Sequence, residues 1–97
     1  MDYTYGHIYG FVNGRGSTIT SLYIDSEFRN QGYGKKLLEL FLTKAFSYNA
    51  LHVELDDCSD NYRKQHNIYI KYGFKYDNND NHMYGNVRNC LKLLKKN

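Results

Sequence analysis

Alternating apolar and polar positions near the start of the chain predict two strands joined by a tight turn. The first strand covers residues 7–12 and the second covers residues 18–24. Between them, Asn13-Gly14-Arg15-Gly16 offers residues that accept a positive φ, as a short hairpin turn requires. We therefore expect a β-hairpin at this end of the chain.

The second of these strands carries little charge on either face. Its alternation places Thr20, Leu22 and Ile24 on one face and Ile19, Ser21 and Tyr23 on the other. A strand that is uncharged on both faces is typical of the interior of a sheet. We expect it to be a central strand.

A helix and a third strand follow. The helix is predicted over residues 35–48, because its apolar side chains recur with helical spacing while charged ones take the opposite side. These apolar positions are Leu37, Leu38, Phe41, Leu42, Ala45 and Phe46. Residues 51–56 then alternate strictly, which predicts a strand with an apolar face and a polar face that carries Glu54 and Asp56.

The last third of the chain predicts a second helix and a closing hairpin. Ser59 can cap the helix, and Gly73 can end it in the left-handed conformation. Two short strands, at residues 74–76 and 82–87, enclose the polar loop of residues 77–81. The basic segment of residues 88–97 has no assigned structure, although an ordinary helix end suits it better than a nucleic-acid or membrane contact.

Length and composition fit one soluble domain over residues 1–97. The chain has 97 residues, 41% of them hydrophobic, which suffices for one compact core. Its net charge of +3 is too mild to indicate a nucleic-acid or membrane protein. Cys58 and Cys90 lack a paired metal-ligand spacing and no secretory segment opens the chain, so we expect a reduced, cytoplasmic setting and no metal.

The segment with the most chemical information joins the second strand to the first helix. Glycines at positions 32 and 34 allow a sharp turn there. Successive amides of such a turn converge, and the helix N-terminus adds about half a positive charge, so the segment suits an anion such as a pyrophosphate. Gly14-Arg15-Gly16 has the same glycine spacing without a following helix, and we interpret it only as a hairpin turn.

Two motifs resemble those of the Gcn5-related N-acetyltransferases, the GNAT family. Arg29-x-x-Gly32-x-Gly34, after a strand and before a helix, is similar to the family's coenzyme A motif. Tyr69-Ile70-Lys71-Tyr72-Gly73-Phe74 resembles its second signature, and the similarity covers about residues 7–87. The resemblance implies an α/β fold with a mixed, mostly antiparallel sheet and two main helices, and with a shortened N-terminus that lacks the family's usual N-terminal helices.

The resemblance also implies the cofactor site. The backbone at Tyr23 and Ile24 is expected to pair with the pantetheine arm of acetyl-coenzyme A, and the amides of residues 31–35 to hold its pyrophosphate. The implied cofactor-binding residues are Leu22, Tyr23, Ile24, Arg29, Asn30, Gln31, Gly32, Tyr33, Gly34, Lys35 and Asn61. The family's early Asn on the second helix is Tyr62 here, with Asn61 beside it, and its small residue is Gln65.

The activity implied is direct acetyl transfer to an amine. Tyr69 is the candidate general acid, because a phenol with a pKa of about 10 can protonate a departing thiolate. Glu54 is the candidate general base, and His52 on the same strand face is an alternative. The structural alternatives are a core role for Tyr69 and a solvated strand position for Glu54. Cys58 is a weaker candidate as a nucleophile than as a free structural thiol.

Three functions remain open at this stage. The first is an N-acetyltransferase, the second a catalytically reduced acetyl-coenzyme A-binding protein that acts as a sensor or assembly subunit, and the third a basic nucleic-acid module. The acidic residues Glu54, Asp56, Asp57 and Asp60 hint at a cationic amine acceptor. The short start of the chain leaves the acceptor side open, so we expect a homodimer or a complex, with Tyr3, Tyr5, Tyr9 and Phe11 as interface candidates. The alternative is a monomer in which residues 87–94 cover the gap.

Overall fold

The computed structural model describes residues 1–57, 68–77 and 81–96. Strands β1 (Asp2–Tyr3), β2 (Gly6–Asn13) and β3 (Gly16–Ile24) come first, followed by the short 3-10 helix η1 (Ser26–Phe28) and helix α1 (Tyr33–Ser47). Strand β4 (His52–Asp56), helix α2 (Ile68–Lys71), strands β5 (Lys75–Tyr76) and β6 (His82–Asn86) and helix α3 (Val87–Lys95) complete the order. Most of the helix expected from Ser59 lies outside the described residues.

The strands form a single mixed sheet in the order β1-β2-β3-β4-β6-β5. Only β3 and β4 are parallel, and the other neighbours are antiparallel. Strand β3 lies inside the sheet between β2 and β4, which confirms its predicted central position. The mostly antiparallel α/β architecture expected from the sequence is therefore confirmed.

A bulge in β3 changes which side chains share a face. Tyr9 of β2 pairs with Ser21, but Gly10 pairs with Ile19, so Thr20 is an extra residue without a partner on β2. Because an extra residue shifts the alternation by one position, Ile19 lies on the same face as Leu22 and Ile24. The prediction that Ile19 faces the opposite side was wrong for this reason, and all three residues contribute to the core.

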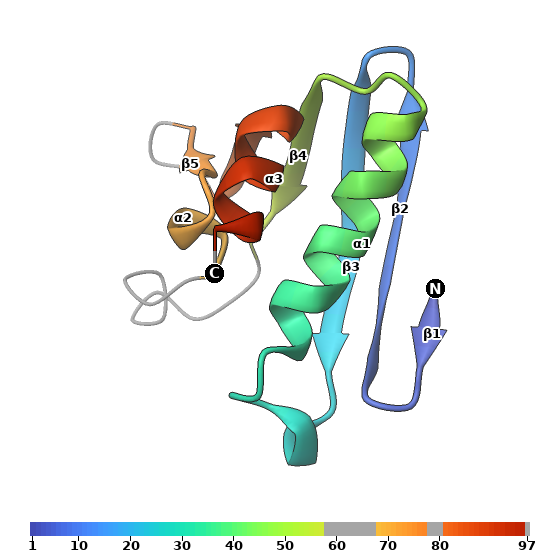
Figure 1. The fold of residues 1–97 in the computed structure, drawn as a ribbon, viewed down its shortest axis with the longest axis vertical. Helices are drawn as coiled ribbons and strands as arrows, with labels where there is room; N and C mark the ends of the chain where they lie inside the picture. Colours follow the sequence, from blue (N-terminus) through green and yellow to red (C-terminus); the bar gives the residue numbers. More distant parts are fainter. Residues whose placement is uncertain (58–67, 78–80, 97) are drawn as a thin grey trace.

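Helices α1 and α3 lie side by side over one face of the sheet (Figure 1). Their apolar sides bury Leu37, Leu38, Phe41, Leu42, Ala45, Val87, Cys90, Leu91 and Leu94 against Ile8, Val53, Leu55, Phe74 and Met83. Phe46 was expected in this set, but it is exposed. Helix α1 begins two residues earlier than predicted and ends one residue earlier.

Helix α3 gives structure to the segment that the sequence left unassigned. Its N-cap, Asn86, accepts a hydrogen bond from the Asn89 amide at 2.9 Å, which stabilises the first turn. Val87, Cys90, Leu91 and Leu94 lie on one side of the helix and are buried. The basic segment is therefore an amphipathic helix packed on α1. No helix in the described part of the chain is long and apolar enough to cross a membrane.

Candidate functional site

Strands β3 and β4 run side by side over only part of their lengths. Their pairing begins at Gly16 with His52 and ends at Ile19 with Leu55, although β3 continues to Ile24. In the described part of the chain, no strand pairs with this edge of β3 beyond Ile19. The two strands therefore form a fork with its tip at Ile19 and Leu55.

Leu22 and Ile24 direct their backbone groups into this fork. The Asp25 amide donates to the Tyr5 carbonyl at 2.8 Å, so the Asp25 backbone faces the N-terminal side of the sheet. Ile8 exchanges hydrogen bonds with Met1, on the edge of β2 that faces away from β3. Because the bonding direction alternates along an antiparallel strand, the Tyr23 backbone bonds to β2 while that of Leu22 faces away from β2. The open backbone groups are thus those of Leu22 and the amide of Ile24, because the Ile24 carbonyl accepts a hydrogen bond from Arg29. The family resemblance implied Tyr23 and Ile24, and the position of Tyr23 is the one that differs.

The chain turns at the mouth of the fork and enters α1. Asn30 and Gly32 have left-handed backbone conformations, with φ of 63° and 86°. The Lys36 amide donates to the Gly32 carbonyl at 3.1 Å, so the amides of residues 33–35 precede the first helical hydrogen bond. A Cβ added at Gly32 would have no atom within 4 Å. The turn thus presents the amides of a helix N-terminus beside open space, as anion binding requires.

Side chains on either side of the turn hold it in place. Arg29 donates from Nε to the Ile24 carbonyl at 3.0 Å, and its guanidinium carbon lies 5.4 Å from the centre of the Tyr23 ring. Gln31 donates from Nε2 to the Glu27 carbonyl at 3.1 Å. Arg29 therefore lies at the mouth of the fork, whereas the Gln31 side chain bonds to the backbone of η1 and does not line the fork.

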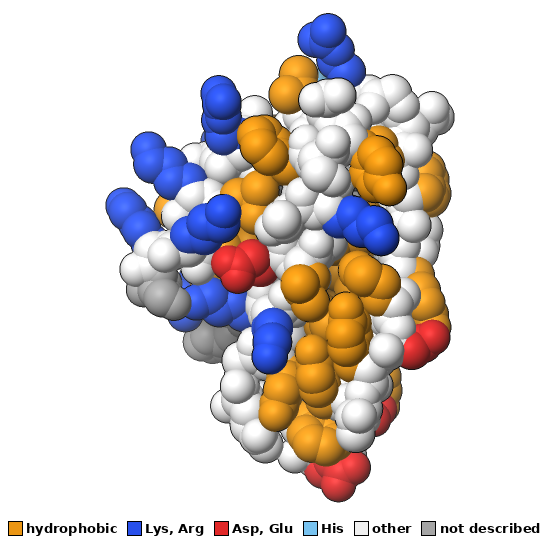
Figure 2. Space-filling view, turned by 45° about the vertical axis from the view of Figure 1, so that its right-hand side comes forward, with side chains coloured by type: hydrophobic (Ala, Val, Ile, Leu, Met, Phe, Trp, Pro, Cys, Tyr) orange, Lys and Arg blue, Asp and Glu red, His pale blue; other side chains and the backbone are white. Residues whose placement is uncertain are grey.

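An aromatic cluster supports the same turn from the N-terminal side. Tyr5 stacks on Tyr33 with 4.1 Å between ring centres, and Phe28 contacts Tyr33 edge-on at 5.7 Å. Tyr3 also stacks on Tyr5, with 5.5 Å between ring centres. Hydrophobic side chains gather in the corresponding lower part of the molecule in Figure 2. These contacts couple the first residues of the chain to the start of α1.

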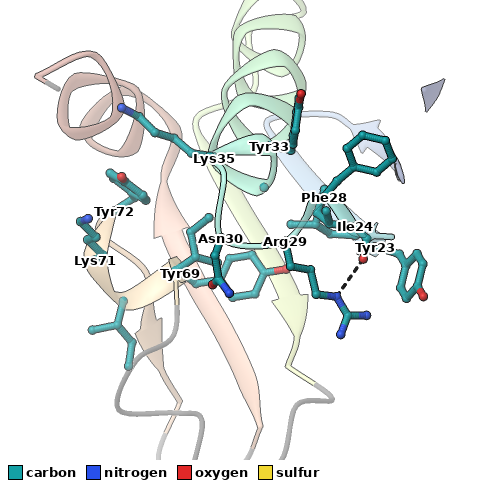
Figure 3. Close-up of a pocket in the computed structure, with 15 residues that line it drawn as sticks. Tyr23, Ile24, Phe28, Arg29, Asn30, Tyr33, Lys35, Tyr69, Lys71 and Tyr72 are labelled. Atoms are coloured by element: carbon teal, nitrogen blue, oxygen red, sulfur yellow. Dashed lines mark hydrogen bonds between the residues drawn. The ribbon is translucent and has the colours of Figure 1, made fainter. Parts of the chain in front are cut away.

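The fork and the turn enclose a cleft of about 920 Å³ (Figure 3). It is lined by Leu22, Tyr23, Ile24, Phe28, Arg29, Asn30, Gly32, Tyr33, Gly34 and Lys35, and across the gap by residues 68–72. The structure therefore brings together every predicted cofactor residue except Gln31, which does not line the cleft, and Asn61, which lies outside the described residues.

Tyr69 lines the cleft from α2, on the side opposite β3. Its ring packs edge-on against Phe74 at 5.5 Å, and its side chain is half-buried. Gly73 follows with φ of 98°, the left-handed helix end that was predicted. Ile68 lies so near the turn that a Cβ at Gly34 would be 3.3 Å from its Cδ1. Glycine at position 34 thus allows α2 to approach the turn.

Glu54 and His52 do not line the cleft. Both lie on the exposed face of β4, away from α1 and α3, and Glu54 is the register partner of Thr18, one position from the tip of the fork. His82 lies between the carboxylates of this face, with its Nε2 3.9 Å from Glu54 and its Nδ1 3.2 Å from Asp56. The candidate base therefore lies near the fork, on the sheet face that also carries Tyr23, but it does not line the cleft.

The expected acidic cluster is only partly present. Asp57 is buried and accepts a hydrogen bond from the Tyr76 hydroxyl, so it does not belong to the exposed acidic face. Cys58, Asp60, Tyr62 and Gln65 lie outside the described residues.

Phe28, Ile68, Ile70, Lys71 and Tyr72 line the cleft without having been predicted. Lys71 and Tyr72 fall within the second motif, from which only Tyr69 was predicted as a site residue. The ammonium groups of Lys35 and Lys71 lie 5.9 and 5.6 Å from the centre of the Tyr72 ring. The sequence does contain a signal for Lys71, because it is a basic residue at the end of a helix that faces an anion-binding turn.

Solved acetyltransferase structures share this fold. Ard1 from Thermoplasma volcanium is 29% identical, with a TM-score of 0.69 over 86% of this chain. PaiA N-acetyltransferase from Thermoplasma acidophilum, in complex with coenzyme A, is 24% identical, with a TM-score of 0.72 over 84% of the chain. A GNAT-family acetyltransferase from Staphylococcus aureus Mu50 is 22% identical, with a TM-score of 0.69 over 84%.

The chain spans 63%, 53% and 59% of the lengths of these three proteins. No curated protein matches it. Residues 2–76 match the family model described as an acetyltransferase (GNAT) domain, and this range includes the fork, the glycine turn and Tyr69. The match covers most of the chain and agrees with the fold and the cleft, and so the chain belongs to the GNAT acetyltransferase family.

Proposed function

We propose that this protein is an N-acetyltransferase that transfers the acetyl group of acetyl-coenzyme A to an amine. The observation that carries the proposal is the cleft, in which the open edge of β3 leads directly to the amides at the start of α1. The family supports the reaction class, and the PaiA structure supports coenzyme A as the ligand.

The residues of the cleft suit acetyl-coenzyme A in shape and charge. The amides of residues 33–35 and the Arg29 guanidinium would hold the pyrophosphate. The open backbone groups of Leu22 and the amide of Ile24 would pair with the pantetheine arm, as an edge strand does, while the Ile24 carbonyl bonds to Arg29. The empty space around the Cβ position of Gly32 leaves room for the phosphates. Asn30, Gly34 and Lys35 line the cleft at the same turn, and we propose that they also contact the cofactor.

Two protein groups would move protons in this reaction. Acetyl-coenzyme A supplies an activated acetyl thioester. The Tyr69 phenol, which lines the cleft, would donate its proton to the sulfur as the carbon–sulfur bond breaks. The Glu54 carboxylate would accept the proton that the amine loses, directly or through water, with His52 as the alternative acceptor.

A catalytically reduced acetyl-coenzyme A-binding protein is the second candidate function. It is favoured by the position of Glu54, which lies outside the cleft and close to His82. A sensor or assembly subunit would need the turn at Gly32 but not an accepting base. The exposed carboxylates of Glu54 and Asp56 lead us to propose a cationic amine if an acceptor is used.

An experiment that measures binding and turnover together tests both candidates. Acetyl-coenzyme A binding is followed by thermal stabilisation, and acetyl transfer is measured over polyamines, amino acids and peptide N-termini. Stabilisation with transfer to one acceptor class supports the enzyme. Stabilisation without any transfer favours the binding protein, and no stabilisation contradicts both.

A further inference from the structure

Two ammonium groups lie around one tyrosine ring on the rim of the cleft. Lys35 Nζ, from the first turn of α1, is 5.9 Å from the centre of the Tyr72 ring. Lys71 Nζ, from the end of α2, is 5.6 Å from the same centre. Tyr72 is only 5% exposed, so its ring is fixed by the core and holds both cations at the surface.

This basic rim is separate from Arg29. In Figure 3, Lys35, Tyr72 and Lys71 lie together along one side of the cleft, while Arg29 and Tyr23 lie on the other, with Asn30 between them. Arg29 is bonded to the Ile24 carbonyl beside β3. The cleft therefore has positive charge on both sides of the glycine turn.

The charges of the ligand exceed what the turn and Arg29 can match. Coenzyme A carries a pyrophosphate and, on its ribose, a 3′-phosphate monoester with a charge of about −1.5 to −2 at neutral pH. The amides of residues 33–35 and Arg29 are suited to the pyrophosphate. Lys71 is exposed on the rim, and among the described residues it forms no ion pair. The 3′-phosphate of coenzyme A would be an anion in reach of the Lys71 ammonium group.

We propose that Lys71, held beside Lys35 by the Tyr72 ring, recognises the 3′-phosphate of coenzyme A and makes the site prefer coenzyme A to its 3′-dephospho form. The inference rests on the proposed function, because it places the same ligand in the same cleft. An aromatic platform for the adenine ring is a poorer interpretation, because so little of Tyr72 is exposed.

The test compares the dissociation constants of coenzyme A and 3′-dephospho-coenzyme A by calorimetry at low salt. A charge-assisted hydrogen bond to the 3′-phosphate is expected to make coenzyme A bind about 10- to 100-fold more tightly. Lys71→Gln should reduce this ratio to nearly one by weakening coenzyme A binding, with the affinity for the dephospho form unchanged. Lys71→Arg should retain most of the preference.

Lys75→Gln is the matched control, since Lys75 is exposed on β5 and does not line the cleft. It should keep the wild-type ratio. Equal binding of both ligands to the wild type, or a ratio that survives Lys71→Gln, would overturn the inference while leaving the cofactor site intact. Failure of both ligands to bind would instead contradict the proposed function.

Discussion

Arg29 and Ile24 are joined by a hydrogen bond of 3.0 Å from the arginine Nε to the isoleucine carbonyl. This bond ties the residue before the glycine turn to the end of β3. Because Nε is used in this way, the terminal nitrogens of the guanidinium remain at the mouth of the cleft, over the Tyr23 ring. Arg29 thus combines a structural contact with a charge in position for a phosphate.

We predict that Arg29→Gln raises the dissociation constant of acetyl-coenzyme A by about 10-fold or more, since it removes a charged hydrogen bond to the pyrophosphate. The free energy of unfolding should fall by only about 1 kcal/mol, because the bond to the Ile24 carbonyl that is lost lies at the surface. Arg15→Gln in the hairpin turn is the control and should leave the affinity unchanged. Equal affinities of the two variants would remove Arg29 from the site.

Gly32 and Gly14 provide a matched pair for the glycine turn. Both have left-handed backbone conformations, and a Cβ at either would meet no atom within 4 Å. Valine at either position should therefore cost about 1–2 kcal/mol of stability through backbone strain alone. Only Gly32→Val should also abolish acetyl-coenzyme A binding, because only Gly32 lines the cleft.

Differential scanning fluorimetry with and without acetyl-coenzyme A distinguishes these effects. Ligand at 100 times its dissociation constant stabilises the folded state by about 2.7 kcal/mol, which raises the melting temperature by roughly 10 °C or more in a domain of this size. Wild type and Gly14→Val should show this rise. A rise that persists in Gly32→Val would contradict the placement of the ligand.

The sequence was sufficient to predict elements whose signals are local. Helix α1, strand β4 and the left-handed Gly73 each follow from periodicity or from the needs of a helix end. The cleft residues were predicted from two motifs. Each motif is a short contiguous segment, so its residues can be recognised without knowing the fold. These helices, strands and motifs can be predicted without knowing which other segments pack against them.

The missed features depend on contacts between distant segments. The orientation of Ile19 depends on the bulge at Thr20, which is defined only by pairing with β2. Phe46 is exposed although it has the helical spacing of the buried residues, and this spacing alone does not reveal its exposure. The helical spacing of Val87, Cys90, Leu91 and Leu94 is itself a signal for α3, although the segment was interpreted by its charge. That Glu54 lies outside the cleft depends on where β4 pairs with β3, because this pairing ends at Ile19 and Leu55.

Tyr69→Phe tests the proposed general acid. We expect it to preserve acetyl-coenzyme A affinity and to lower kcat by about 10²- to 10⁴-fold, because the ring remains against Phe74 while the proton donor is lost. The measurement requires an acceptor from the amine panel. Tyr48→Phe, exposed beyond the end of α1, is the control and should retain full activity. An unchanged kcat in Tyr69→Phe would assign Tyr69 to the core.

Cys90 should make stability depend on alkaline pH. Its thiol is fully buried, and burial raises its pKa from 9.0 to about 11. Between these values the unfolded thiol ionises and the folded thiol does not, so the unfolded state binds fewer protons and the free energy of unfolding falls as pH rises. Below pH 9 both states are protonated and this contribution is constant. The full effect is about 2–3 kcal/mol.

Urea denaturation of the wild type and Cys90→Ala at pH 8, 9, 10 and 11 measures this contribution. The alanine variant will be less stable at pH 8, because it leaves a small cavity, but its stability should fall less steeply above pH 9. In a Cys58→Ser variant, Cys90 is the single thiol of the chain. Because Cys90 is buried, a thiol-alkylating reagent should react with it only when the protein unfolds. Parallel pH dependences of wild type and Cys90→Ala would show that the thiol ionises equally in both states.

The sheet face opposite α1 and α3 remains a candidate interface between two copies of the chain. Helix α3 packs beside α1, so residues 87–94, which the monomer alternative placed over the gap, lie on the other face of the sheet. Tyr9, Phe11, Tyr23 and Tyr84 alternate with core residues on their strands and are 41–53% exposed. No described helix covers this face. Exposed aromatic groups of this kind are enriched where soluble proteins associate.

We predict a homodimer that pairs this face across a two-fold axis, with a mass near twice the 11.5 kDa of the monomer in light scattering at micromolar concentration. Phe11→Glu should give the monomer mass without loss of helical circular dichroism, because a carboxylate buried at an interface is strongly unfavourable and one exposed on a monomer is not. Leu40→Glu is the control: Leu40 is an exposed hydrophobic side chain of similar exposure on α1, and its replacement should leave the dimer intact. A wild-type mass near 11.5 kDa, unaltered by acetyl-coenzyme A, would rule out the homodimer, whereas dissociation by Leu40→Glu alone would place the interface on α1 instead.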